Sequence, residues 1–502
     1  MKALQASDRS VFPDPVYRET VLKPLFDGAK RHLASALKAV DRAHLVMLVE
    51  TGIVSREQGA TIAGALEAIA AEVDPLTLSY TGAVEDYFFL MEGELKQRVG
   101  ADIGGRLHTA RSRNDIDHTL FKLVLKQHVD RLLLKCRTLL GALVDTAERD
   151  KAVLVVAYTH GQPAQPTTYG HYLGAVIEVL VRDIERLEAA RAIIDLSPMG
   201  AAAITTSGFP IDRARVAHLL GFAGAMPNSY SCIASVDYIT SIFSAIELLF
   251  LHLGRPIQDF QVWSSFEVGQ LYMPNAFVQI SSIMPQKRNP VPIEHLRHLS
   301  AQTVGRARAV VNVMHNTPFT DMVDSEGDTQ EMGYQVFEVA GRVLDLLAVT
   351  VPAGAIDSAR VAVNLRRSCA TITELADTLV RVEGLSFRLA HGIAAQVART
   401  VVALSGDLPS DGYAPFALAF KERAGRDSSI GPDEFARIVS PEHFVAVRER
   451  FGGPGPAALD AAIRGYRTAL KDFEQRAEDR ARRESNAAAE LAARFAELVG
   501  GA

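Results

Sequence analysis

The sequence predicts a soluble, all-α protein built around a bundle of long helices. Ala, Leu and Val dominate the composition while aromatic residues make up only 7%, a bias that favours helices over a sandwich or a barrel. Apolar residues recur at intervals of three and four over several long segments, which is the spacing of one helical face. Sustained spacing of this kind is typical of helices that pack at shallow angles in a bundle.

The clearest helical periodicity lies in the middle of the chain. The apolar stripes run over residues 121–143, 173–187 and 239–253, and we interpret them as faces that form the core. Stretches rich in Gly, Pro, Ser and Thr separate these helices. Since loops on a rigid scaffold concentrate binding and catalysis, functional residues are expected there. The stretches are 103–114, 158–168, 197–210, 279–290 and 316–329.

Length and composition divide the chain into three parts. With 502 residues, it is long enough for about three domains or one large composite fold. We expect boundaries near residues 112 and 365, which give an N-terminal helical domain (1–112), a central helical bundle (113–365) and a C-terminal helical domain (366–502). The Ala-rich stretch 471–499, which has mixed charge, is expected to form a surface helix.

The charge balance and the cysteines narrow the possible function classes. Lys plus Arg number 53 against 59 Asp plus Glu, a formal net charge of −6, which argues against a general nucleic-acid-binding surface. The three cysteines form no CxxC pair, so we expect neither disulfides nor a thiolate metal site, and a cytoplasmic location is favoured. The N-terminus lacks the apolar segment of a signal peptide. The most apolar later stretch, 242–253, is too short to span a bilayer.

The loop Ser281-Ser-Ile-Met-Pro-Gln-Lys-Arg-Asn-Pro290 is the most informative segment. Its two prolines are incompatible with a helix interior, and Lys287 and Asn289 place an ammonium and an amide beside two serine hydroxyls. Such a loop can wrap a small anion and present a hydroxyl to it. From the residues alone, a capped turn before the next helix, with Lys287 solvated, is the more ordinary alternative.

This loop resembles the signature sequence of the aspartase/fumarase superfamily. His108-Thr-Ala-Arg-Ser-Arg-Asn-Asp115 resembles the fumarate-binding segment of the argininosuccinate lyase branch, and Tyr158-Thr-His-Gly-Gln-Pro-Ala-Gln-Pro166 resembles its second region. Weaker similarities follow the family order, so the resemblance covers about residues 85–340.

The resemblance implies a three-part helical subunit and a homotetramer, in which four central bundles form a twenty-helix core. Each active site would then draw segments from three subunits. The implied reaction is a reversible elimination that splits an N-substituted aspartate into fumarate and an amine. No cofactor, no metal, no nucleic acid and no membrane partner is expected.

The resemblance also implies roles for individual residues. Ser281 stands where the family has its general base, and Lys287 together with loop amides could stabilise the alkoxide that this role needs. His160 could protonate the leaving nitrogen or orient the substrate, with a water as the alternative acid. Donors and cations would face the carboxylate on which negative charge develops, and Arg113, Lys287 and Arg288 are expected to form a local basic pocket. The implied substrate-binding residues are Ser112, Arg113, Asn114, Thr159, Met284, Asn289 and Gln330.

The chain departs from the argininosuccinate lyase pattern where the leaving amine is held. Phe319 lies near the usual tyrosine, and Gly333 stands where a lysine is expected. A ligand that needs the missing phenol and ammonium would lose several kcal/mol of binding. We therefore expect an aminopolycarboxylate substrate such as ethylenediamine-disuccinate or iminodisuccinate. The alternatives are argininosuccinate, as in arginine biosynthesis, and a structural oligomer without catalysis. The same segment is acidic, with Asp321, Asp324, Glu326 and Asp328.

Overall fold

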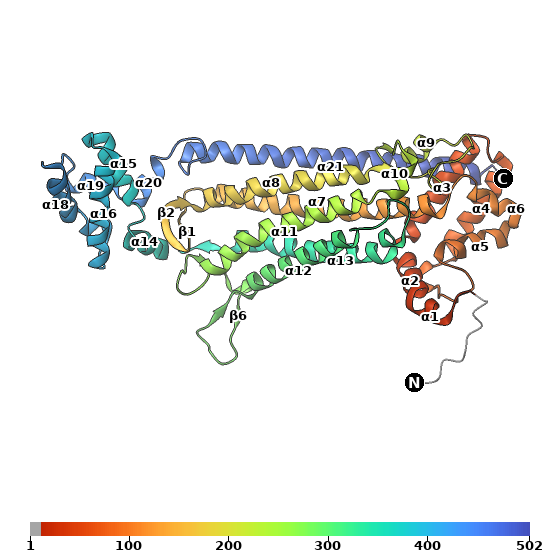
Figure 1. Cartoon of the computed structure of the whole chain (residues 1–502), viewed down its shortest axis with the longest axis horizontal. Coiled ribbons are helices and arrows are strands. Elements are labelled where there is room, and N and C mark those ends of the chain that lie inside the picture. The colour runs from red at the N-terminus through yellow and green to blue at the C-terminus, as the bar shows by residue number, and fades with distance from the viewer. Residues whose placement is uncertain (1–11, 502) are drawn as a thin grey trace.

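The computed structural model of the chain describes residues 12–501, which form an elongated and almost entirely helical molecule (Figure 1). Long helices lie side by side along its length, as the apolar stripes predict, so the all-α bundle is confirmed. These helices are α7 (Arg113–Arg149), α8 (Tyr169–Ile194), α11 (Asp237–Trp263), α12 (Val291–Val313) and α13 (Gly327–Ala353).

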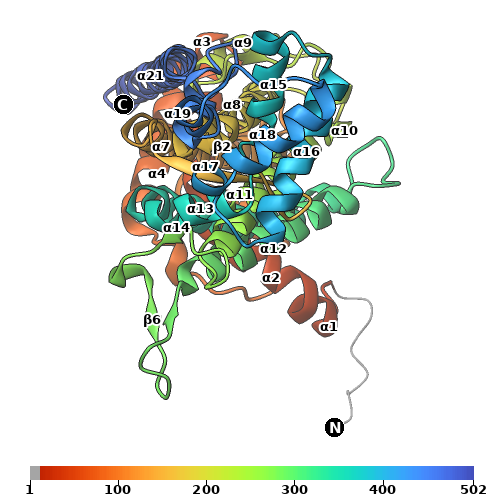
Figure 2. The same ribbon diagram turned by 90° about the vertical axis from the view of Figure 1, so that its left-hand side faces the viewer.

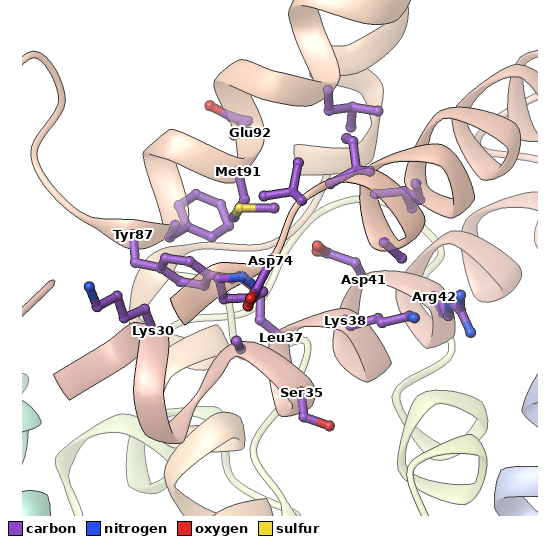
Figure 3. Close-up of a pocket in the computed structure, with 18 of the residues that line it drawn as sticks. Lys30, Ser35, Leu37, Lys38, Asp41, Arg42, Asp74, Tyr87, Met91 and Glu92 are labelled. Atoms are coloured by element: carbon purple, nitrogen blue, oxygen red, sulfur yellow. The ribbon is translucent and has the colours of Figure 1, made fainter. Parts of the chain in front are cut away.

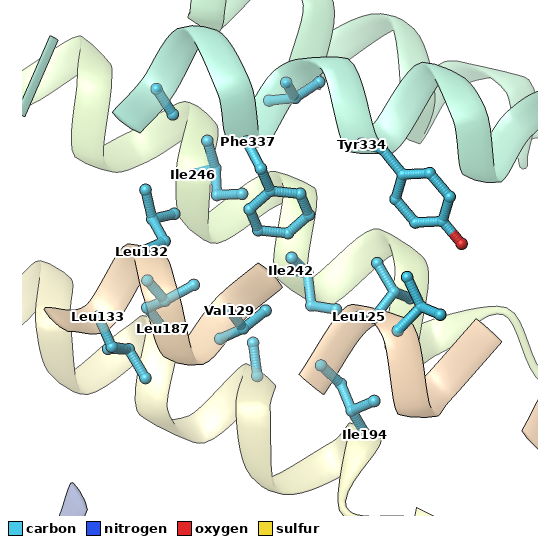
Figure 4. Close-up of a cluster of buried hydrophobic side chains, with 14 of the residues drawn as sticks. Leu125, Val129, Leu132, Leu133, Leu187, Ile194, Ile242, Ile246, Tyr334 and Phe337 are labelled. Atoms are coloured by element: carbon cyan, nitrogen blue, oxygen red, sulfur yellow. The ribbon is translucent and has the colours of Figure 1, made fainter. Parts of the chain in front are cut away.

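The core of the bundle forms where the apolar stripes meet. Figure 4 shows Val129 of α7, Leu187 of α8, Ile246 of α11 and Phe337 of α13 gathered in one cluster, and all four are buried. Because each helix carries apolar residues at spacings of three and four, each presents one continuous face to its neighbours.

The residues before α7 fold into shorter helices at one end of the bundle (Figure 1). One of them, α4, begins at a capping box in which Ser55 and Gln58 satisfy each other's backbone N–H groups. The elements are α1 (Pro15–Tyr17), η1 (Arg18–Leu22), α2 (Lys23–His32), α3 (Ala34–Glu50), α4 (Arg56–Glu72), η2 (Pro75–Thr77), α5 (Tyr87–Val99), α6 (Ala101–Gly105) and η3 (Arg106–His108).

Short strands connect the long helices in the described part of the chain. The strands β1 (Leu154–Thr159) and β2 (Gln162–Thr168) form an antiparallel hairpin, as do β6 (Gln279–Ile280) and β7 (Arg288–Asn289). The parallel pair β3–β4 and the antiparallel pair β5–β8 join other loops. The remaining elements of this region are β3 (Leu196–Ser197), α9 (Arg213–Leu219), β4 (Gly224–Ala225), α10 (Ser229–Ala234), β5 (Leu271–Tyr272), η4 (Asn275–Phe277), η5 (Val323–Ser325) and β8 (Ala355–Ile356).

The C-terminal residues form two separate structures. A group of helices with its own core, which includes Leu375, Ile393 and Phe416, lies at the end of the bundle opposite the N-terminal helices (Figure 1). The helix α21 (Pro456–Val499) then runs back along α7 and α8 and packs against α3 and α4. It contains the predicted surface helix 471–499, while the division of the chain into three domains stays a prediction. The group comprises α15 (Ile372–Glu383), α16 (Phe387–Ala403), α17 (Leu408–Asp411), α18 (Tyr413–Ala424) and α19 (Pro432–Ile438), while α14 (Ser358–Arg367) and α20 (Pro441–Ala446) contact the β1–β2 hairpin.

Helix α11 is longer than the apolar stretch 242–253 suggests. Of the described helices, it is the one that by length and composition could cross a membrane, and half of its most apolar window is buried inside the chain. Ile239, Ile242 and Ile246 on its inner face are all buried in the bundle core. Helix α11 is therefore buried as a core helix of the bundle.

Candidate active site

The first motif segment, residues 108–115, ends in a capped and buried start of α7. Ser112 accepts a hydrogen bond from the Asn114 N–H, and the Asp115 carboxylate accepts one from the Ser112 N–H at 2.8 Å. Asp115 is fully buried and accepts two more N–H groups, from Gly200 at 2.8 Å and Ala202 at 2.9 Å. Burial raises the pKa of Asp115 to about 6, although these hydrogen bonds favour its ionised form. The capping box explains why the helix begins here.

Arg113, the first residue of α7, is surrounded by carboxylates. Its guanidinium forms ion pairs with Asp86, with Asp117 at 3.2 Å and with Glu85 at 3.5 Å. Burial raises the pKa of Asp117 to about 7; Arg113 opposes this shift, while Glu326 and Asp86 add to it. Within the chain, Arg113 is therefore a neutralised cation.

A cavity of about 290 Å³ adjoins this cluster, between α2, the start of α5, α7 and the start of α13. Asp117 and Glu326 line it together with Arg113 and Gln330. The buried Gln330 amide donates to the Ser325 carbonyl oxygen at 2.9 Å and to the Tyr238 hydroxyl at 3.4 Å, so it also supports the wall. Sequence reasoning missed Asp117; its position four residues after Arg113 on one helix face is a signal that could have revealed it.

The second motif segment forms the tip of the β1–β2 hairpin. His160 and Gly161 both adopt left-handed backbone conformations, with φ values of 53° and 73°, as a two-residue type I′ turn requires. Thr159 and His160 are exposed. Among the described residues, none forms a hydrogen bond with the His160 imidazole, so the tip presents this ring to its surroundings.

The third motif segment forms the tip of the β6–β7 hairpin, which projects from the bundle (Figure 2). The Ser281 Oγ accepts hydrogen bonds from the backbone N–H groups of Met284 at 3.0 Å and Ile283 at 3.3 Å. Two donors on one hydroxyl oxygen are what a developing alkoxide needs. Lys287 is exposed, and Asn289 pairs with Gln279 at the base of the hairpin.

One chain does not bring the three segments together. Ser112 lies at one end of α7 and both hairpins lie toward the other end (Figure 1), and 37 helical residues span about 55 Å. Within one chain Arg113 therefore lies far from Lys287 and Arg288, and the expected basic pocket of these three residues stays a prediction that needs a further subunit. Moreover, Arg288 is already bonded to the Asn275 side chain and to the Met273 carbonyl oxygen.

The two departures from the lyase pattern have clear structural settings. Gly333 faces Phe243 so closely that an added Cβ would lie 2.5 Å from the ring. A lysine therefore cannot enter this position unless Phe243 moves. Phe319 is 68% exposed and stacks on Tyr230 with ring centroids 5.9 Å apart. Neither residue supplies a polar group to a ligand.

Comparisons with known proteins show which family the chain resembles. The lyase family model matches residues 19–305, and the model of the argininosuccinate lyase C-terminal region matches residues 369–446. Argininosuccinate lyase 2 of Agrobacterium fabrum is 66% identical over 494 residues, which cover 98% of both chains. Argininosuccinate lyase of Methylococcus capsulatus is 35% identical over 85% of this chain and 90% of its own. A crystal structure of EDDS lyase in complex with formate has a TM-score of 0.84 at 26% identity, covering 97% of this chain and 96% of the other.

The helical bundle, the three motif segments and these similarities define a lyase of the aspartase/fumarase superfamily. Within it, the chain belongs to the argininosuccinate lyase branch and is a carbon–nitrogen lyase that releases fumarate. The resemblance inferred from the motifs is confirmed.

Proposed function

We propose that the chain is an argininosuccinate lyase, which splits argininosuccinate into fumarate and arginine. The observation that carries this proposal is the argininosuccinate lyase that is 66% identical over nearly its whole length. It favours argininosuccinate over the aminopolycarboxylate substrate expected from the sequence. As an enzyme of this branch, the chain is also not the non-catalytic oligomer weighed above.

In the proposed mechanism, Ser281 removes a proton from the carbon next to a substrate carboxylate. The two backbone N–H groups on its Oγ would stabilise the alkoxide that takes this proton. The electron pair left on carbon moves onto the carboxylate, where Lys287, Asn289, Asn114 and Thr159 would bind the added charge.

The carbon–nitrogen bond then breaks as the carbanion electrons form the double bond of fumarate. The departing nitrogen takes a proton from His160 or from a water. His160 suits this role because an imidazole can donate a proton near neutral pH, and its exposed position on the hairpin tip leaves it accessible.

We further propose a cytoplasmic homotetramer in which each active site combines segments of three subunits. The separation of Ser112 from Ser281 along the bundle requires another chain to complete a site. Ile280 and Ile283 beside Ser281 are each 83% exposed, and a neighbouring subunit would cover them. The free, buried cysteines suit a reducing compartment.

A second candidate substrate class, the aminopolycarboxylates, is favoured by one specific observation. Gly333 is packed against Phe243 and Phe319 is turned outward, so the lysine and tyrosine usual for the branch are both absent. An amine product that needs neither group would not suffer from their loss.

One assay separates the two substrate classes. Purified protein is offered argininosuccinate, ethylenediamine-disuccinate and iminodisuccinate separately, and fumarate formation is followed by ultraviolet absorbance, with the Ser281→Ala protein as a control for contaminating host lyases. We expect the highest kcat/KM with argininosuccinate. A higher value with either aminopolycarboxylate would overturn the proposal in favour of the second candidate.

A further inference from the structure

A larger cavity, of about 460 Å³, lies inside the N-terminal group of helices (Figure 3). It lies between α3, α4 and α5 and is partly open to solvent, and none of the residues assigned to substrate binding lines it. Packed interiors leave few voids larger than a water molecule, and small-molecule sites typically measure about 300–1,000 Å³. The cavity is therefore large enough for a ligand.

Most of its wall is apolar. Leu37 of α3, Ile69 of α4, and Phe88 and Met91 of α5 contribute side chains to it, and Val73, which follows α4, and Leu107 line it as well. Such a wall favours the apolar body of a ligand, because each buried methylene contributes about 0.8 kcal/mol.

The acidic residues of the cavity are already bonded within the chain. Asp41 pairs with the buried Arg111 at 2.6 Å, and Glu92 pairs with Lys96 at 2.7 Å. Asp74 accepts the backbone N–H of Leu76 at 2.9 Å. Five cationic and three acidic side chains line the cavity in all, namely Lys30, Arg31, Lys38, Arg42 and Arg111 against Asp41, Asp74 and Glu92. Three of these cations also form ion pairs with carboxylates outside the cavity, Lys30 with Asp27, Arg31 with Glu331 and Arg42 with Glu67.

Several donors in this wall lack an acceptor in the described part of the chain. The Nε–H groups of Arg42 and Arg111 are buried without a hydrogen-bond partner, and the Arg111 side chain is only 2% exposed. Lys38 is exposed and forms no ion pair or hydrogen bond with a described residue, and Figure 3 shows it on the same side of the cavity as Asp41 and Arg42. Buried donors without partners are rare in native proteins and call for an explanation.

We propose that this cavity binds an amphipathic carboxylate, such as a medium-chain fatty acid or another apolar monocarboxylate. Its apolar body would lie between α3, α4 and α5, and its carboxylate would accept hydrogen bonds on the side of Lys38 and Arg42. A charged acceptor matches these donors better than a neutral one, since hydrogen bonds between charged groups are the stronger kind.

The cavity shares a wall with the cavity of about 290 Å³ that adjoins Arg113. Leu37, Tyr87 and Phe88 line both, and Asp86, which pairs with Arg113, directly precedes Tyr87.

The test is calorimetric titration of the full-length protein with decanoate, with and without saturating fumarate. We expect saturable binding of one decanoate per chain that fumarate does not abolish. Ala70→Phe, which fills the cavity, weakens binding at least about tenfold. Ala71→Phe adds the same ring to the same helix at an exposed position outside the cavity and leaves binding unchanged.

A second pair of variants tests whether the positive charge of Lys38 contributes to binding. This test does not require α4 to accommodate an aromatic ring. Lys38→Gln weakens decanoate binding about tenfold but not binding of decan-1-ol, and Lys471→Gln on exposed α21 surface changes neither. Three results would each overturn the proposal: no saturable binding, displacement of decanoate by fumarate, or equal affinities in Ala70→Phe and Ala71→Phe. Equal effects of Lys38→Gln on the acid and the alcohol would overturn the assignment of a carboxylate.

Discussion

The two ends of α7 present their motif segments in opposite states. At the amino end, Asp115 is buried and three backbone N–H groups of its own chain hold its carboxylate. At the other end, Ser281 and His160 sit on exposed hairpin tips whose order comes from local backbone geometry. At the amino end, the chain itself supplies the hydrogen-bond donors to Asp115. In the proposed tetramer, a further subunit would cover the exposed hairpin tips at the other end.

This contrast separates stability from catalysis. A change at the buried end removes contacts that the fold needs, so it should lower the free energy of unfolding. A change at an exposed tip leaves the buried contacts intact and should alter turnover, with at most about 1 kcal/mol of lost stability. Four predictions test this separation.

The largest effect is expected at the exposed tip. Ser281→Ala should lower kcat about 10³-fold, because a general base contributes on the order of 10² to 10⁴, while thermal unfolding stays as in the unmodified protein. The matched control is Ser282→Ala, the adjacent hydroxyl, for which turnover should stay within a fewfold. Turnover of Ser281→Ala near that of the unmodified protein would remove Ser281 from its proposed role.

At the buried end, Asp115→Ala should lower the free energy of unfolding by about 3 kcal/mol, since it leaves three buried N–H groups without an acceptor. Denaturant unfolding measures this value. Asp102→Ala, at a side chain that is 79% exposed, should change it by less than about 0.5 kcal/mol. If both variants unfold alike, the buried network does not stabilise the start of α7.

A smaller effect at the same end depends on pH. The pKa of Asp117 is raised from 3.8 to about 7, so the folded protein holds this proton more tightly than the unfolded chain. The stabilisation is fully present below about pH 4 and is lost as pH rises through about 7. Relative to Asp117→Asn, the unmodified protein should therefore become progressively less stable as pH rises over this range. A difference between the two proteins that stays constant with pH would contradict this.

The smallest effect concerns the turn at His160. Gly161 has a φ of 73°, so Gly161→Ala should cost about 1 kcal/mol. The control is Gly64→Ala, at an exposed position on α4 with nothing within 4 Å of an added Cβ. This change should raise the free energy of unfolding, because Ala is favoured over Gly within a helix by about 0.5–1 kcal/mol. Chemical denaturation measures the free energy of unfolding of both variants. If both substitutions change it in the same direction, the turn at Gly161 is not strained.

Local sequence patterns predicted the bundle and the three motif segments because each of these features depends on residues that are close together in the sequence. The apolar stripe of α7 and the proline-rich loop at Ser281 need no tertiary information. The neutralisation of Arg113 does need it, because Asp86 lies 27 residues earlier and Glu326 joins the same cluster from the residue just before α13. The sequence alone therefore could not show that carboxylates of the same chain surround Arg113.

Helix α21 has a further consequence for the behaviour of the protein on heating. Its ends are fixed by buried apolar residues such as Ile463 and Phe495, whereas its middle is tied to α8 by the pairs Arg476–Glu185 and Arg480–Glu188. The dehydration penalty of ion pairs falls as temperature rises. The contacts of the middle of α21 with α8 should therefore weaken less on heating than the apolar contacts at its ends. Added salt acts in the opposite sense, because it screens the exposed pairs first.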